Sequence, residues 1–187
     1  MRLIIIGPQG AGKGTQAILI AERFGIPHVS TGDIFRANIA HATPLGTEAR
    51  SFIDAGELVP DSVTNAMVLD RLQQPDAGRG FLLDGYPRNA AQSDVLGDFL
   101  ASRGEQIDAV ILLDIDEAHV LERLTHRALQ EGRSDDTEDA IKRRLEIYRE
   151  STAPLIDYYR DRGVLRTVNG VGSVDEVAER IMAALPG

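Results

Sequence analysis

The strongest constraint on the fold is a glycine-rich segment that joins a short apolar run to a helical pattern. Residues 2–6 read RLIII, residues 7–15 read GPQGAGKGT, and the apolar residues that follow recur at helical spacing. Glycines let successive backbone N–H groups converge on an anion at a helix N-terminus. Lys13, inside the loop, can reach the outer phosphates of a nucleotide. The segment therefore predicts a strand, a phosphate-binding loop and a helix, which together are a building unit of parallel α/β sheets.

Two other interpretations of this loop compete with phosphate binding. A glycine-rich turn could merely connect the strand to the helix, although such a turn does not need a lysine in register with both. The dinucleotide pattern fails, because position 15 is threonine and a lysine lies inside the loop. Thr15 also arrives one position later than the hydroxyl of the common pattern, since Gly14 intervenes. A phosphate loop alone leaves kinases, switch proteins and motor ATPases open.

The rest of the chain alternates short apolar runs with helical segments, which predicts an α/β fold with a five-stranded parallel sheet flanked by helices. The expected strands are residues 2–6, 27–30, 80–84, 108–114 and 165–168.

Two helical patterns near the C-terminus are the clearest. The longer one covers residues 136–162, where Pro154 is expected to bend the helix. The last helix is expected to begin at Ser173, which has capping-box spacing to Glu176. The apolar stripe that it is predicted to bury consists of Val174, Val177, Ala178, Ile181, Met182 and Leu185.

Residues 1–187 are expected to form one domain, because no repeat, low-complexity tract or linker marks a second one. Two excursions stand out from the alternating pattern. They cover about residues 30–59 and, more briefly, about residues 126–136. Segments of this kind often close over a ligand.

Composition excludes several classes of function. Acidic residues outnumber basic ones by 29 to 20, and the formal charge of -9 argues against a general nucleic-acid binder. The chain has no cysteine, and its four histidines do not pair at ligand spacing, so no zinc site is expected. The apolar start ends at Gly7, too soon for a signal peptide or membrane span. These features predict a cytoplasmic monomer without membrane contact.

Several motifs closely resemble those of the adenylate kinase family, in the family's order along nearly the whole chain. They are GAGKGTQ at 10–16, STGD at 30–33 with Arg36, GELVPD at 56–61, DGYPR at 84–88 with Gln92, and a series formed by Arg123, Arg127, Gly132, Arg133, Asp135, Asp136 and Arg144. The resemblance implies a three-layer P-loop fold with a helical NMP-binding insertion at about 30–59 and a short lid at about 126–136. It also implies reversible, Mg²⁺-dependent phosphoryl transfer from ATP to AMP, giving two ADP, in adenine nucleotide homeostasis.

The same resemblance implies roles for individual residues. ATP would be held by Gly10, Ala11, Gly12, Lys13, Gly14, Thr15, Arg123, Arg127 and Gly172. AMP would be held by Thr31, Arg36, Glu57, Leu58, Val59, Gly85, Tyr86, Pro87, Arg88, Gln92, Arg133 and Arg144. The cations expected to stabilise the moving phosphoryl group are Lys13, Arg88, Arg127, Arg133 and Arg144. Asp84 ends an apolar run at the expected carboxyl edge of the sheet and is predicted to hold Mg²⁺ through water.

Structural roles stay open for some of these residues. Gln92 and Asn89 have the spacing of a reciprocal helix cap, and Thr31 could be only a helix-start hydroxyl. Asp84 could cap the turn that follows it. Arg123, Arg143 and Arg144 could form a charged helix face with Glu122, Asp139 or Glu146.

Two other functions also stay open. The related pyrimidine monophosphate kinases typically carry alanine at the position of Thr31 and phenylalanine at that of Tyr86, so this chain resembles the adenylate-specific members. A nucleotide-dependent switch would use the phosphate loop without a second phosphate site.

Overall fold

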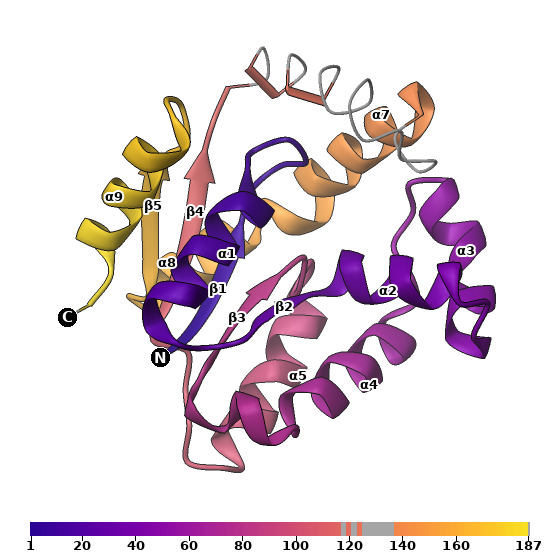
Figure 1. Cartoon of the computed structure of the whole chain (residues 1–187), viewed down its shortest axis with the longest axis horizontal. Coiled ribbons are helices and arrows are strands. Elements are labelled where there is room, and N and C mark those ends of the chain that lie inside the picture. Colours follow the sequence, from indigo (N-terminus) through magenta and orange to yellow (C-terminus); the bar gives the residue numbers. More distant parts are fainter. Residues whose placement is uncertain (117–118, 121–122, 125–136, 187) are drawn as a thin grey trace.

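The computed structural model describes residues 1–116, 119–120, 123–124 and 137–186. Within these residues, five strands form one parallel sheet in the order β2-β3-β1-β4-β5 (Figure 1). The strands are β1 (Arg2–Ile6), β2 (His28–Ser30), β3 (Phe81–Asp84), β4 (Ala109–Asp114) and β5 (Leu165–Asn169). Each lies within one residue of its predicted bounds, so the predicted α/β class and the five-stranded parallel sheet are confirmed.

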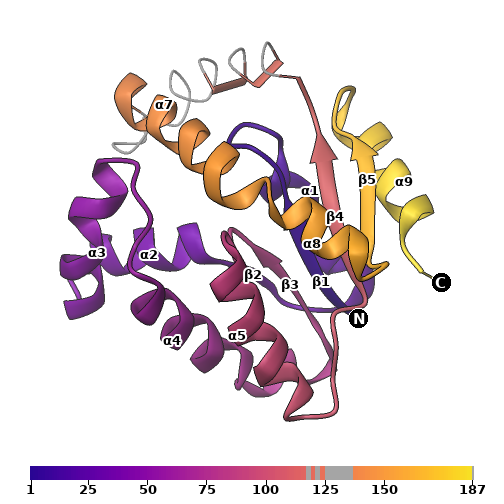
Figure 2. The ribbon, with the colours of Figure 1, turned by 180° about the vertical axis from the view of Figure 1, so that it is seen from behind.

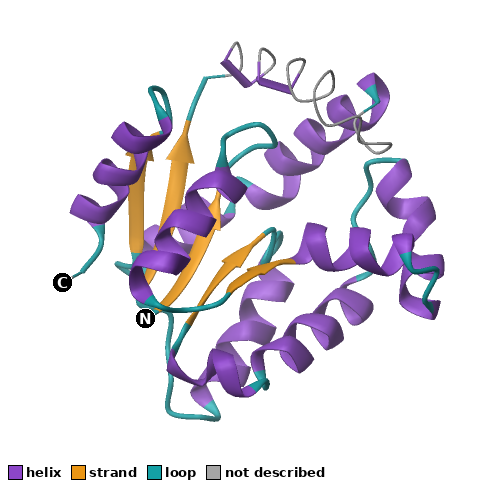
Figure 3. Ribbon diagram, in the orientation of Figure 1, coloured by secondary structure: helices purple, strands orange, loops and turns teal. Residues whose placement is uncertain are grey.

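Helices cover both faces of this sheet, as Figure 3 shows. The described helices are α1 (Lys13–Phe24), α2 (Thr31–Ala40), α3 (Pro44–Asp54), α4 (Asp61–Leu72), α5 (Ala90–Ala101), α7 (Glu138–Ile147), α8 (Leu155–Asp161) and α9 (Val174–Ala184), with a 3₁₀ turn η1 (Pro75–Arg79) and a π turn η2 (Tyr148–Thr152).

The core has two halves because side chains alternate between the faces of a strand. In β1, Leu3 and Ile5 belong to a cluster with residues of α1 and α9. Ile4 and Ile6 belong to the other cluster, with residues of α4, α5 and α8. Figure 2 shows α5 and α8 from this second side. The three layers leave the carboxyl ends of the strands free to face a ligand site.

The helix predicted at residues 136–162 consists of three elements, α7, the π turn η2 and α8. Thr137 caps α7 through the amide of Ala140, and α7 continues into the π turn before α8 begins after Pro154. The amide of Ala153 donates to the carbonyl oxygen of Tyr148 at 2.7 Å, which is the wider spacing of a π turn. The helix is therefore divided next to Pro154, where a bend was predicted, and a π turn precedes the proline. Residue 136, the predicted start, lies outside the described residues.

The capping box at the start of α9 is confirmed, since both reciprocal hydrogen bonds between Ser173 and Glu176 are present. The prediction that Val174 is buried is wrong, because it is 47% exposed. The buried stripe consists of Val177, Ile181 and Leu185, four residues apart, whereas Ala178 and Met182 are half-buried. Val174 is the first residue of α9, where it lines both cavities instead of packing in the core.

The excursion at residues 30–59 contains α2 and α3, which share a small apolar cluster of their own around Phe35, Ala49 and Val59. Gly46 lets the two helices approach, since a Cβ there would lie 2.1 Å from the carbonyl oxygen of Asn38. Within the described part of the chain, no helix is both long and apolar enough to cross a membrane.

Candidate active site

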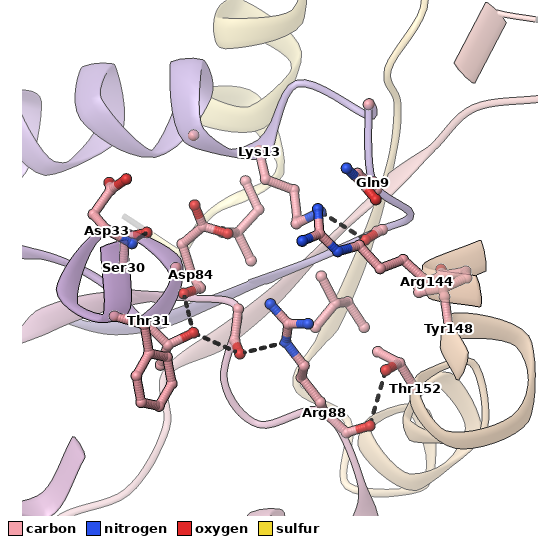
Figure 4. A pocket seen from close by; sticks show the side chains of 18 of the residues that line it. Gln9, Lys13, Ser30, Thr31, Asp33, Asp84, Arg88, Arg144, Tyr148 and Thr152 are labelled. Atoms are coloured by element: carbon pink, nitrogen blue, oxygen red, sulfur yellow. Dashed lines mark hydrogen bonds between the residues drawn. The ribbon is translucent and has the colours of Figure 1, made fainter. Parts of the chain in front are cut away.

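A cavity of about 1010 Å³ lies at the carboxyl ends of β1, β2 and β3. Its walls are the glycine-rich loop, the start of α2, residues 56–59, the segment after β3, and the junction of α7 with the π turn (Figure 4). Segments far apart in the sequence therefore meet here. They bring together most of the described residues that the sequence assigns to a site.

The glycine-rich loop has the backbone that an anion site requires. Gly10 and Gly12 have φ angles of 83° and 92°, in the left-handed region that favours glycine. A Cβ at Gly10 would lie 2.9 Å from the side chain of Leu124, so a larger residue does not fit. The first intrahelical bond of α1 runs from Gln16 to Gly12. The preceding amides of Lys13, Gly14 and Thr15 are therefore at the helix end where anions bind.

Lys13 folds back over this loop. Its Nζ donates to the carbonyl oxygens of Gly7 and Pro8 at 2.8 and 2.9 Å. The first turn of α1 carries no acidic residue, so no carboxylate within that turn reduces the positive potential of the helix end. The loop is thus a concentrated positive site in an acidic protein.

The carbonyl oxygen of Gly85 orients two predicted site residues. It accepts from Nε of Arg88 at 2.8 Å and from the Thr31 hydroxyl at 3.0 Å. Gly85 has a φ of 81°, and a Cβ there would lie 2.6 Å from the Thr31 hydroxyl oxygen. The glycine is therefore required for both contacts. The Thr152 hydroxyl donates to the backbone oxygen of Arg88 at 2.8 Å and fixes the same turn from the π-turn side.

Four arginines line the same cavity: Arg36, Arg88, Arg123 and Arg144. Burial lowers the pKa of Arg88 below its ordinary value, and the positive charges of Arg144 and Arg36 add to that effect while Asp84 opposes it. Arg36 also pairs with Asp33 at 2.6 Å, and this pairing lowers the pKa of Asp33 although burial alone would raise it. Like charges held this close are typical of a site for a polyanion.

Helix α7 touches the excursion at residues 30–59. Arg144 donates to the carbonyl oxygen of Ile53 at 3.1 Å, and Arg143 pairs with Glu57 at 2.6 Å. Gly56 packs so closely on Ala140 that a Cβ at Gly56 would lie 2.6 Å from the Ala140 carbonyl oxygen. The predicted surface pairing of Arg143 with Glu146 is confirmed at 3.3 Å, whereas the stronger pair with Glu57 was not predicted.

Gln92 has the predicted cap position, because the Asn89 side chain accepts from the Gln92 amide N–H at 2.9 Å. The reciprocal bond is displaced by one residue, since Gln92 Oε1 accepts from the amide of Arg88. Gln92 Nε2 donates to Asp61 at 2.8 Å. An amide has two donor hydrogens and two acceptor lone pairs, so these bonds leave capacity for a ligand.

The other residues assigned to AMP lie as follows. Glu57, Leu58, Val59 and Pro87 line the cavity. The side chain of Tyr86 lies behind the cavity wall, 1% exposed, and its hydroxyl donates to Asn65 at 2.8 Å. Burial raises the pKa of Tyr86. Any contribution of Tyr86 to a ligand would therefore come from its backbone or from the walls it supports.

Asp84 sits at the end of β3, where its carboxylate faces the first turn of α1. A Cβ built on Gly14 would lie 3.8 Å from Oδ2 of Asp84. Within the described residues, no three His, Asp or Glu side chains gather into a metal cluster. A lone carboxylate beside a phosphate site fits Mg²⁺, which usually keeps several waters and takes one or two carboxylates plus substrate phosphates.

A smaller cavity of about 340 Å³ lies beside the loop, between α1 and the start of α9. Arg123 forms one wall, and its guanidinium donates to the carbonyl oxygens of Ala11 and Gly170 at 3.1 and 3.0 Å. Gly172 and Val174 line the opposite wall. Arg123 and Gly172, which the sequence assigns to the same ligand, are therefore in one place.

The residues of the main cavity that have no place in the motifs include His28, Tyr148 and Thr152. Nε2 of His28 lies 3.5 Å from Oδ2 of Asp84. Burial raises the pKa of the Tyr148 hydroxyl, and the charge of Asp114 adds to that effect. His28 is the first residue of β2 and lies inside a predicted strand, so no sequence signal assigned it to this site. Arg127, Arg133 and the proposed lid at about 126–136 lie outside the described residues.

Comparison with known proteins gives one consistent result. The family model "Adenylate kinase" matches residues 5–164. A protein named adenylate kinase from a Nocardioides species is 57% identical over 185 residues, which cover 99% of this chain and 97% of its own. Adenylate kinases from Kocuria rhizophila and Bifidobacterium longum are 57% and 55% identical, covering 98% and 99% of this chain and 98% and 100% of their own. Each alignment thus includes every segment of the cavity wall.

Proposed function

The chain belongs to the adenylate kinase family, and we propose that it transfers a phosphoryl group reversibly between ATP and AMP to give two ADP. The observation that carries this proposal is that one cavity joins two cationic sites. Lys13 and the start of α1 would form one site, Arg36 and Arg88 would form the other, and Arg144 would reach both. A switch or a hydrolase needs one nucleotide site, whereas direct transfer needs both phosphate chains in one space.

The donor ATP would take the loop side. The amides at the start of α1 and Lys13 would hold its phosphates, as the left-handed glycines and the uncapped helix end support. Its base would enter the smaller cavity, between Arg123 and the segment with Gly172. The residues proposed for this side are Gly10, Ala11, Gly12, Lys13, Gly14, Thr15, Arg123, Arg127 and Gly172.

The acceptor AMP would take the side of the excursion at residues 30–59. Arg36 and Arg88 supply planar pairs of donors that match a phosphate. The segment at 57–59 and Gln92 would enclose the adenine, with Thr31 beside it. Arg144 lies near both sides and would bridge the two nucleotides, and Arg133 is proposed for the same role by family resemblance.

The chemistry needs little from the protein beyond placement and charge. An AMP phosphate oxygen is already anionic, so it attacks without a general base. Lys13, Arg88 and Arg144 would stabilise the charge that spreads over the moving group. Mg²⁺, when bound, would neutralise charge on the ATP phosphates, and Asp84 is the residue proposed to hold it through water. Closure of the excursion at 30–59 and of the proposed lid at about 126–136 would exclude water as a competing acceptor.

The physical setting of this activity follows from composition. The formal charge of -9 disfavours nucleic-acid partners, and the absence of cysteine is consistent with a site without zinc. We expect a cytoplasmic monomer whose ligands are ATP, AMP and ADP.

A coupled assay of ADP formation tests the proposal. ATP and Mg²⁺ are supplied with AMP, UMP, CMP or no acceptor. We expect fast turnover with AMP alone. Preference for UMP or CMP would refute the acceptor assignment and point to a pyrimidine kinase, and equal rates without acceptor would point to a hydrolase.

The two lysines of the chain provide a matched pair of variants. Lys13→Ala is expected to lower turnover by about 10²–10³-fold, the usual cost of losing one preorganised charge donor. Lys142 lies on the exposed face of α7, where it pairs with Glu138, so Lys142→Ala is expected to keep normal turnover. Similar losses in the two variants would refute the role of Lys13.

A further inference from the structure

Thr152 carries a buried hydroxyl at the main cavity, and no motif assigns it a role. It is 8% exposed and lines the cavity from the π turn η2, a kind of turn that is frequent at functional sites. Its hydroxyl donates to the backbone oxygen of Arg88 at 2.8 Å, as Figure 4 shows. Threonines in helical segments often bond to the carbonyl oxygen four residues earlier, which here is that of Tyr148. Thr152 instead reaches across to the turn after β3.

Arg88 lies outside the helices and strands, so its backbone depends on side chains to hold it. It precedes Asn89, the cap of α5, and its carbonyl oxygen therefore lies outside the hydrogen bonds of that helix. Its amide donates to Gln92 Oε1 at 2.7 Å, and its Nε donates to the carbonyl oxygen of Gly85 at 2.8 Å. The bond from Thr152 adds a third contact, and this one comes from the opposite wall of the cavity.

The same helical segment also carries Arg144. It lies on α7, which continues directly into η2, so Arg144 and Thr152 belong to one continuous piece of the structure. Burial lowers the pKa of Arg88, and the charge of Arg144 adds to that effect. The two guanidinium groups therefore repel each other when no polyanion lies between them. A misplacement of about 1 Å can cost a reaction on the order of 10² in rate, so the position of Arg88 matters for phosphoryl transfer.

We infer that Thr152 is a positioning residue, which holds Arg88 in place beside Arg144 for the transfer of the phosphoryl group. This inference rests on the proposed function, because it concerns the step that Arg88 is proposed to assist. Thr152 acts through the backbone of Arg88. Loss of its hydroxyl should therefore slow the transfer and leave ATP binding unchanged.

A competing role for Thr152 is to stabilise the packing of η2 against the turn after β3. Both roles would lower activity when the hydroxyl is removed. They differ in whether the loss depends on the side chain of Arg88. In Arg88→Met the backbone oxygen can still accept from Thr152, but no guanidinium remains to be positioned. This background therefore separates the two roles.

The experiment measures ADP formation in Thr152→Val, in Thr152→Ser, and in Thr152→Val combined with Arg88→Met. Thr152→Val keeps the branched shape but removes the donor, so kcat is expected to fall about tenfold while the KM for ATP changes little. Thr152→Ser keeps the hydroxyl and should stay within about twofold of wild type. In the Arg88→Met background, Thr152→Val should lower kcat by less than about twofold. Equal losses in the two backgrounds would overturn the inference.

Thr47→Val is the matched control, because the Thr47 hydroxyl also donates to a carbonyl oxygen, that of Thr43, but on the exposed side of α3. It should keep the wild-type kcat. If Thr152→Val does not fold, comparison of Thr152→Ala with Thr152→Ser isolates the same hydroxyl. We expect kcat about tenfold lower in the alanine variant, and equal values would overturn the inference. A wild-type protein that forms no ADP from ATP and AMP would refute the proposed function, and the inference with it.

Discussion

Arg88 is the residue at which activity and stability are expected to respond in opposite directions. It faces the cavity beside Arg36 and Arg144, and burial together with these charges lowers its pKa. We expect Arg88→Met to lower kcat for ADP formation by about 10²–10³-fold, because one preorganised charge donor is lost. The KM for ATP should change little, since Arg88 is proposed to bind the acceptor.

The same change is expected to leave the fold intact or slightly more stable. It removes a charge that folding buries among like charges, and methionine fills the volume of the arginine stem. It also removes the 2.8 Å bond from Arg88 Nε to Gly85, but the Gly85 oxygen still accepts from Thr31. The gain and the loss are of similar size, so the free energy of unfolding should rise by about 0–1 kcal/mol. For a chain of this length, Tm would rise by up to about 4 °C.

Steady-state kinetics and thermal unfolding without nucleotide measure both effects. Arg160→Met is the matched control, because Arg160 lies exposed on α8 and pairs with Asp157. It should keep normal turnover and show no rise in Tm. Near-normal kcat in Arg88→Met would refute the catalytic assignment. A Tm lowered by several degrees would refute the argument that like charges disfavour Arg88 in the folded protein.

Three further predictions concern packing, pH and the contacts of α7. Gly46→Ala should lower the free energy of unfolding by about 1–3 kcal/mol, because its Cβ would strike the backbone of α2. For the same reason it should raise the KM for AMP more than the KM for ATP. Gly78→Ala, which has open space around its Cβ, is the control for thermal unfolding and kinetics. Burial raises the pKa of Tyr159 to about 12, whereas an unfolded tyrosine ionises near about 10, so stability should fall as pH rises from about 10 to 12. In Tyr159→Phe, the free energy of unfolding measured with urea should fall less between these pH values. An unchanged fall would contradict the assignment of this pH dependence to Tyr159. Glu57→Gln should raise the KM for AMP about two- to fivefold, because it weakens the pair with Arg143. An equal rise in Arg143→Gln, with no further rise in the double variant, would identify the pair as the cause.

Local signals in the sequence predicted the framework of the molecule well. Strand bounds followed from apolar runs, the phosphate loop from glycine and lysine spacing, and the cap of α9 from Ser173 and Glu176. These features depend on near neighbours in the chain, so a single sequence carries them. Val174 was predicted wrongly because its spacing matches the buried stripe, although it is the first residue of the helix and lines a cavity.

Contacts between distant segments could not be predicted from periodicity or spacing. The pair of Arg143 with Glu57 joins residues 86 positions apart, and the Thr152 bond to Arg88 joins residues 64 apart. Neither residue pair belongs to one element, so no period relates them. The shared carbonyl of Gly85 is likewise invisible in the sequence, because it uses the backbone of one residue and the side chains of two others.

The contacts between α7 and the excursion at residues 30–59 bear on how fast the protein can cycle. Gly56 against Ala140 and Glu57 against Arg143 belong to the protein itself and favour the arrangement in which the excursion lies against α7. Each ~1.4 kcal/mol by which these contacts stabilise the excursion against α7 would raise the population of this arrangement, relative to one with the excursion away from α7, about tenfold. The conformational cost of binding AMP would fall by the same amount. The same preference slows the opening that releases ADP. An exposed ion pair, worth roughly 0.2–1 kcal/mol, would bias this equilibrium without locking it.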